Sequence, residues 1–129
     1  MRLEILPKAL AICRLAAADA VPPWANGPFL SITRTESELS IVCDFTAVPQ
    51  DVKSVAAWRA LRVEGTLDFS LTGILASLAQ PLAEAAISIF AISTYDTDYV
   101  LVREGDLAKA IEILSLAGHS ISGPSGAVR

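Results

Sequence analysis

The sequence predicts an α+β protein in which antiparallel sheets carry helices on one face. Strand-like runs of aliphatic and β-branched residues, such as "SIVCDF" and "YVLV", recur along the chain and are separated by turn residues. Two segments of the second half instead place apolar residues at the spacing of amphipathic helices. Hydrophobic residues make up 53% of the 129 positions and charged residues 19%, which supplies a core and argues against disorder.

The second half is predicted to contain four strands and two helices. The strands are residues 58–63, 87–94, 99–103 and 119–122, and the helices are residues 70–86 and 106–116. Pro81 lies inside the first helix and should kink it or tighten its final turn, because proline lacks an amide hydrogen. Gly118 stands where a left-handed C-cap residue is expected. The order strand, helix, strand, strand, helix, strand is the split βαβ, or ferredoxin-like, arrangement.

The first half contains strands in a similar order but no long helix. The predicted strands are residues 3–6, 9–15, 29–33 and 39–45, with a short helical turn at 52–57. Between the second and third strands, "VPPWANGP" is a loop, because its prolines and its Asn-Gly pair are turn chemistry. We therefore interpret residues 1–57 as a degenerate N-terminal unit, residues 58–122 as a complete second unit and residues 123–129 as a flexible tail.

Charge and hydropathy exclude several classes of partner. The net charge is −4 and the ten basic residues are scattered singly, which argues against nucleic acid. No apolar run reaches the length that spans a bilayer, and the first residues do not resemble a signal peptide, so we expect a cytoplasmic protein. Cys13 and Cys43 are then expected to be buried thiols. Two cysteines and one histidine, His119, are too few of the usual metal ligands to indicate a metal site, and we predict no cofactor.

A polar segment, "STYDTD", interrupts the most strand-like part of the chain at residues 93–98. One interpretation is a hairpin turn, and Asp96 is typical of such a turn because aspartate bonds its own backbone there. The other interpretation is one wall of a ligand site. Asp98 favours the second, because it begins the returning strand instead of standing at the tip of the turn.

The start of the first predicted helix has the chemistry of a site for a zwitterion. A helix N-terminus presents unpaired N–H groups and a partial positive charge, which suit a carboxylate. Gly73 allows close approach, and Ser70 and Thr72 add hydroxyls. Asp68 and Asp98 supply negative charge for an ammonium or guanidinium group. Structural interpretations stand beside these, since Gly73 can serve close helix packing and Asp68 can serve as a helix cap.

The segment "DFSLTGILASLAQPLAEAAISIFAISTYDTDYVLV" resembles an ACT domain, the regulatory module that binds amino acids in many metabolic enzymes. Taken with "LPKALAICRL", "PFLSIT" and "WRALRVEG", nearly the whole chain is similar to small bacterial proteins of two ACT-like units. It is also similar to the ACT units of the CASTOR-type cytosolic arginine sensors. The resemblance implies two ferredoxin-like βαββαβ units, the first of them degenerate, whose sheets join side by side.

The family's ligand contacts come from the loop before the first helix and from the second strand of the paired unit. Carried onto this chain, the resemblance implies these ligand-binding residues: Asp68, Phe69, Ser70, Leu71, Thr72, Gly73, Ile74, Ser93, Thr94, Thr97 and Asp98. The first half lacks a comparable glycine loop and is not expected to form an equivalent site. The implied ligand is an amino acid or a similar small zwitterion, with arginine suggested by the sensors.

These observations predict a non-catalytic regulatory protein, acting as a homodimer, that binds a small molecule at a unit or subunit interface. The alternative is an interaction or oligomerisation module without a functional ligand site. Catalysis is not predicted, because the sequence has no nucleophile elbow, no metal-ligand spacing and no phosphate-binding glycine loop. Asp96 and Asp98 alone are too few oxygens for a divalent cation.

Overall fold

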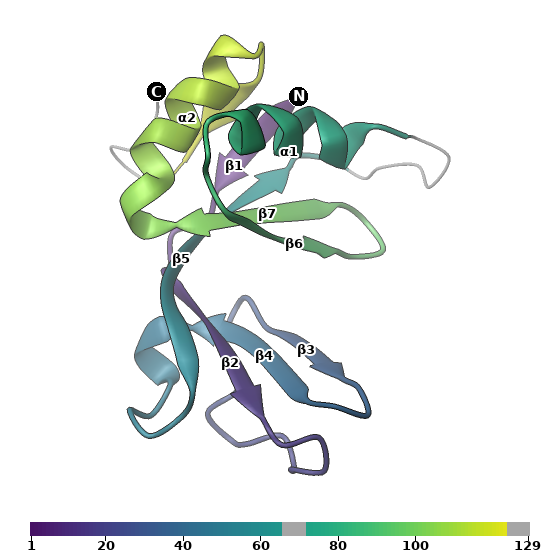
Figure 1. Ribbon diagram of the computed structural model, residues 1–129, viewed down its shortest axis with the longest axis vertical. Coiled ribbons are helices and arrows are strands. Elements are labelled where there is room, and N and C mark those ends of the chain that lie inside the picture. The colour runs from purple at the N-terminus through teal and green to yellow at the C-terminus, as the bar shows by residue number, and fades with distance from the viewer. Residues whose placement is uncertain (66–71, 124–129) are drawn as a thin grey trace. The chain divides into compact units, whose positions relative to one another are not determined.

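The chain forms two compact units in a computed structural model that describes residues 1–65 and 72–123 (Figure 1). The N-terminal unit comprises Lys8–Trp58. The C-terminal unit comprises Met1–Pro7 together with the residues from Arg59 onward. Strand β5 (Ser54–Val63) supplies its first residues to one unit and its last residues to the other.

The C-terminal unit is a mixed sheet that carries two helices. Its further strands are β1 (Arg2–Ile5), β6 (Ile89–Ser93), β7 (Asp98–Arg103) and β8 (Ser120–Ser122), and its helices are α1 (Ile74–Glu84), the 3-10 turn η2 (Glu104–Asp106) and α2 (Leu107–Leu116). The strand order is β6-β7-β5-β1-β8. β1 runs antiparallel to β5 and parallel to β8. The predicted α+β, ferredoxin-like arrangement is confirmed, with one additional strand.

The additional strand is β1, which the sequence-based division placed with the first half of the chain. Leu3 pairs with Val63 on β5 and with Ile121 on β8, so β1 lies between the first and last strands of the complete unit. Leu3 and Ile5 both point into the core and are buried. Their alternation predicts a half-buried strand, but it carries no information about which sheet the strand joins.

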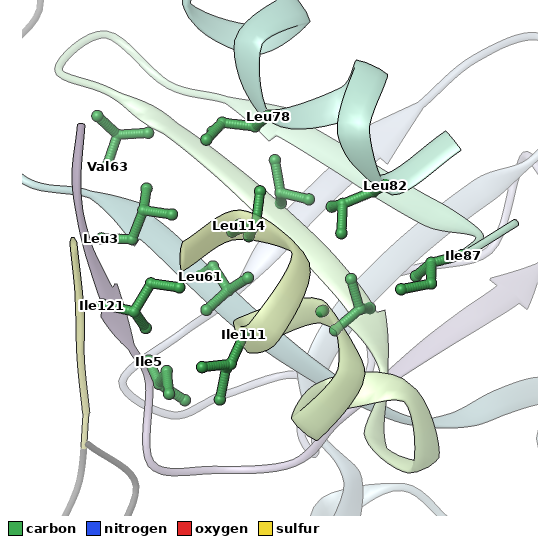
Figure 2. Close-up of a cluster of buried hydrophobic side chains, with 13 residues drawn as sticks. Leu3, Ile5, Leu61, Val63, Leu78, Leu82, Ile87, Ile111, Leu114 and Ile121 are labelled. Carbon is green, nitrogen blue, oxygen red and sulfur yellow. The ribbon is translucent and has the colours of Figure 1, made fainter. Parts of the chain in front are cut away.

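Both helices pack on one face of this sheet. Figure 2 shows Leu82 of α1 and Leu114 of α2 pointing into the same cluster as Leu61 of β5. The buried members of the cluster are Leu3, Ile5, Leu61, Val63, Leu78, Leu82, Ile87, Val100, Val102, Ala110, Ile111, Leu114 and Ile121. Burying an aliphatic side chain contributes about 1.5–3 kcal/mol. The helical periodicity that predicts the two helices therefore also supplies most of their attachment to the sheet.

Both helices end in the same left-handed motif. After α2, Gly118 has φ 99°, and the amides of Gly118 and His119 bond the carbonyls of Ser115 and Leu114. After α1, Ala86 takes the corresponding place with φ 60°. These paired bonds satisfy carbonyls that a helix end leaves open, and they confirm Gly118 as the predicted C-cap glycine.

Pro81 leaves one carbonyl of α1 without its helical partner, and His119 supplies the replacement. Proline has no amide hydrogen, so it cannot bond the carbonyl of Ser77 four residues earlier. His119 Nε2 lies 3.1 Å from that carbonyl oxygen. Because a carbonyl only accepts, Nε2 carries the proton, and Nδ1 accepts from the nitrogen of Met1 at 3.1 Å. In the last turn of α1 the Ala85 amide bonds the carbonyls of both Leu82 and Pro81 at 3.2 Å, so the turn is partly tightened, as expected after Pro81.

Removing the His119 imidazole should cost more stability when Pro81 is present than when it is replaced. His119→Ala is expected to lower the free energy of unfolding by about 1 kcal/mol, the usual worth of one hydrogen bond. In a Pro81→Ala background the helix regains a donor for the Ser77 carbonyl, so the same substitution should cost less. Urea unfolding of the four proteins measures the coupling. Additive losses would show that His119 does not serve this carbonyl.

The N-terminal unit is a four-stranded antiparallel sheet without an α-helix in its described residues. Its strands are β2 (Leu10–Leu15), β3 (Ser31–Arg34), β4 (Leu39–Asp44) and the first part of β5, in the order β3-β4-β2-β5, with a 3-10 turn η1 (Phe45–Ala47) after β4. Trp24 and Ala25 of the proline-rich loop pack against the buried cluster where the first helix of a complete unit would stand. The replacement of that helix by a loop is as predicted.

The helical turn predicted at residues 52–57 is wrong, because most of this segment belongs to β5. Ser54 and Val55 pair with Cys13 and Ile12 of β2. The short segment "VKSVAA" has no strong local preference, and the open edge of β2 provides backbone partners that a single helical turn cannot match. Trp58 is buried near the end of this pairing.

Cys13 and Cys43 are free, buried thiols in this unit, as predicted. Burial raises the pKa of the Cys13 thiol to about 11, and the neighbouring Cys43 adds to the rise. Burial also raises the pKa of Cys43, and the charge of Asp44 adds to it. Both side chains therefore stay protonated at neutral pH and act as small apolar residues, since only the thiolate is reactive.

Candidate functional site

The polar segment at residues 93–98 is the turn of the β6–β7 hairpin. Ser93 pairs with Asp98 at the last position of the ladder, and the Thr94 amide donates to the Thr97 carbonyl at 2.9 Å. Tyr95 stands at the tip with 78% of its surface exposed, and Asp96 beside it is exposed too. The turn interpretation is therefore confirmed for the tip, while the flanking residues have further contacts.

Asp98 is held in a defined position at the start of β7. The Ser93 hydroxyl donates to Asp98 Oδ1 at 2.6 Å, across the last pair of the ladder. The Asp98 side chain is half-buried, unlike that of Asp96. Within residues 1–65 and 72–123, no lysine or arginine forms an ion pair with Asp98. A carboxylate has about four acceptor positions, so one hydrogen bond leaves capacity for a cationic ligand group.

Thr97 points in the opposite direction, into the protein. Its side chain is only 4% exposed, and its hydroxyl donates to the carbonyl of Val63 at 2.7 Å. Val63 is the last residue of β5, so this bond ties the hairpin turn to the strand that precedes α1. Sequence spacing groups Thr97 with Asp98, but adjacent strand residues face opposite sides of a sheet.

A glycine in the left-handed conformation precedes α1. Gly73 precedes the helix with φ 78°, and no side chain bonds the first amides in the described part of the chain. A Cβ added at Gly73 would meet no atom of the described chain within 4 Å, so close packing does not explain the glycine. The left-handed backbone does explain it. Thr72 is exposed and Ile74 is half-buried.

The candidate residues therefore fall into three groups. Ser93, Thr94, Thr97 and Asp98 are brought together in one hairpin turn, and Thr72, Gly73 and Ile74 form the entry to α1. Asp68, Phe69, Ser70 and Leu71 lie outside the described residues. The hydrogen bond from the Thr97 hydroxyl to the Val63 carbonyl was not predicted, because every residue has a backbone carbonyl and the sequence does not indicate which one is the acceptor.

Other kinds of site find no support in the part of the chain that the structure describes. There, no group of three or more histidine, cysteine, aspartate or glutamate side chains is placed to hold a metal ion. No helix among these residues has the length and apolar character needed to cross a membrane.

Comparison with protein families assigns the second part of the chain. The sequence model of the ACT domain matches residues 53–115, which contain β5 from its start, α1, the β6–β7 hairpin and most of α2. A separate model, describing an N-terminal domain, matches residues 8–51. The match to residues 8–51 lies in the N-terminal unit, and the match to residues 53–115 lies in the C-terminal unit except for its first six residues.

Curated relatives include sensor proteins. The cytosolic arginine sensor for mTORC1 subunit 1 from Homo sapiens is 36% identical over 106 residues, covering 76% of this chain and 32% of that protein. Putative protein CASTOR3P from Homo sapiens is 36% identical over 100 residues, covering 67% of this chain and 61% of that protein. The chain thus spans about a third of the length of the sensor subunit.

Solved structures extend the similarity over nearly the whole chain. Protein Atu0741 from Agobacterium tumefaciens is 44% identical with a TM-score of 0.90, covering 95% of this chain and 92% of that one. The Clostridium acetobutylicum aspartate kinase, an allosteric enzyme, shares the fold with a TM-score of 0.62 at 14% identity, covering 89% of this chain and 34% of the kinase. The family-model match and the βαββαβ order of the strands and helices show that residues 53–115 of this chain belong to the ACT domain family.

Proposed function

We propose that this protein is a regulatory sensor that binds an amino acid, with arginine the first candidate. The observation that carries the proposal is the half-buried carboxylate of Asp98, oriented by Ser93 and without a cationic partner among the described residues. The relationship to a protein named as an arginine sensor supports arginine. A regulatory, small-molecule-binding role also agrees with membership of the ACT domain proteins.

The proposed site divides the ligand between two elements. Asp98 accepts hydrogen bonds from an ammonium or guanidinium group, an interaction strengthened by charge. The ligand carboxylate faces the entry to α1, where the helix dipole favours an anion and no side chain of the described residues caps the first amides. Thr72, Gly73 and Ile74 belong to this entry, and Asp68, Phe69, Ser70 and Leu71 complete the proposed set. Ser93 and Thr94 line the turn side.

A second copy of the chain is the proposed partner in the assembly. Among the described strands, β6 pairs only with β7, so it is an edge strand of the C-terminal unit, and an edge strand can pair with a strand of another chain. A strand of a second copy satisfies such an edge and places a ligand site at the joint. The protein acts in the cytoplasm, and its function is regulatory and not catalytic. Ligand occupancy shifts the equilibrium between conformations or assembly states.

The same edge position of β6 favours the alternative, a pure interaction module. In that case the hairpin serves assembly alone, and no amino acid changes the stability of the protein. The two functions therefore separate in a binding experiment.

A thermal-shift screen of the native chain against the twenty amino acids tests the proposal. A ligand that binds only the folded state adds about 2.7 kcal/mol at 100 times its dissociation constant. In a domain of this size the midpoint of unfolding rises by several degrees. Citrulline, which lacks the guanidinium charge, and agmatine, which lacks the carboxylate, separate the two halves of the site. A flat screen at millimolar concentrations would contradict the sensor function and favour the interaction module.

A further inference from the structure

We propose that Thr97 is a positioning residue that holds the Asp98 side of the ligand site in register with the end of β5. The inference rests on the proposed function, since it names how that site is kept in shape. Thr97 does not contact the ligand in this proposal. It acts through the neighbouring Asp98 and through the strand that leads towards α1.

Thr97 is buried, and its hydroxyl is hydrogen-bonded. Within residues 1–65 and 72–123, Thr97 is the one polar side chain that is buried, apart from the cysteine thiols. A buried hydroxyl is tolerated because it is hydrogen-bonded, and here the partner is the Val63 carbonyl at 2.7 Å. Valine has nearly the same shape and no hydroxyl. The choice of threonine is therefore explained by the bond and not by packing.

The acceptor of this hydrogen bond, the Val63 carbonyl, lies at the end of β5. Val63 ends β5, the Glu64 amide bonds the Arg2 carbonyl at 2.9 Å, and Gly65 then turns the chain with φ 88°. The β5 end is thus fixed on one side by β1 and on the other by Thr97. From Gly65 the chain proceeds towards the entry of α1, the element proposed to receive the ligand carboxylate.

The construction of the turn carries the third step. The Thr94 hydroxyl donates to the Thr97 carbonyl, and the Thr94 and Thr97 backbones bond each other. Asp98 follows directly and is bonded to Ser93. These bonds make the turn a compact body, and the Thr97 hydroxyl is its side-chain link to β5. If this link is lost, the turn can move, and Asp98 then moves relative to the end of β5.

The test compares Thr97→Val, which removes the hydroxyl, with Thr97→Ser, which keeps it. Thr46→Val is the matched control, because it makes the same chemical change at a hydrogen-bonded threonine of the N-terminal unit and leaves the link to Val63. Amide hydrogen exchange at Glu64, Gly65 and Asp98 reports the link without any ligand. Isothermal titration with arginine reports the site. Thr97→Val should raise exchange at these amides about tenfold and weaken arginine binding by about the same factor, as loss of a buried hydrogen bond implies.

Thr97→Ser distinguishes a role of the Thr97 hydroxyl from a role of the size of the side chain. Thr97→Ser should keep both exchange and arginine affinity close to those of the native chain, and Thr46→Val should leave both unchanged. Equal behaviour of Thr97→Val and Thr97→Ser would overturn the inference. Arginine binding that stays unchanged in Thr97→Val would also overturn it, while leaving the sensor function intact. Native protein that binds neither arginine nor another amino acid would refute the function instead, and the exchange data would still decide the link.

Discussion

Leu114→Ala is expected to lower the free energy of unfolding by about 2–5 kcal/mol, the range for deleting a buried leucine side chain. Leu114 is completely buried in the cluster between α2, α1 and the sheet. The substitution removes apolar contacts and leaves a cavity that the surrounding strands fill only in part. At this chain length the loss corresponds to a fall of roughly ten degrees or more in the midpoint of thermal unfolding.

Leu116→Ala is the matched control for this prediction. Leu116 lies two residues further along the same helix, and 81% of its surface is exposed. The same chemical change should therefore alter stability by no more than about 0.5 kcal/mol, as is usual at the surface. Urea unfolding of both variants measures the difference. Similar losses at the two positions would mean that α2 does not pack through the face that contains Leu114.

Asp98→Asn is expected to weaken arginine binding by about tenfold to a hundredfold while leaving the fold intact. Asparagine keeps the shape of aspartate and an oxygen that can accept from Ser93, so the hairpin retains its closing contact. The charge is lost, and hydrogen bonds to charged groups contribute about 1.5–3 kcal/mol. Isothermal titration with arginine measures the effect. The unfolding midpoint without ligand serves as the check on folding.

Asp96→Asn provides the comparison, since Asp96 belongs to the same turn but is exposed at its tip. The two variants have the same net charge, so any long-range electrostatic effect on a cationic ligand is nearly equal in both. Only the loss of a direct contact separates them. If both variants lose affinity to the same extent, Asp98 does not touch the ligand, and the ligand responds only to the overall charge of the turn.

The sequence determines those features of this protein that local patterns encode. Helical spacing of apolar residues identifies α1 and α2, because one face of each helix must be covered. Gly118 marks the end of α2, because its left-handed backbone is strained for other residues. The proline-rich loop excludes a helix between β2 and β3 for equally local reasons. The polar run before Asp98 marks the hairpin, since turn chemistry depends on a few adjacent residues.

Only the tertiary structure decides which distant segments meet. The alternation of Leu3 and Ile5 predicts a strand, yet its place between β5 and β8 depends on partners 56 or more positions away. Residues 54–57 become a strand because β2 offers an unpaired edge, which outweighs a weak local preference. The inward position of Thr97 is stabilised by the hydrogen bond from its hydroxyl to the Val63 carbonyl. His119 bonds the Ser77 carbonyl, for which Pro81 has no amide hydrogen to donate. Every residue has the same backbone carbonyl, so the sequence does not indicate which carbonyl accepts from a given side chain, and only the folded structure shows the pairing.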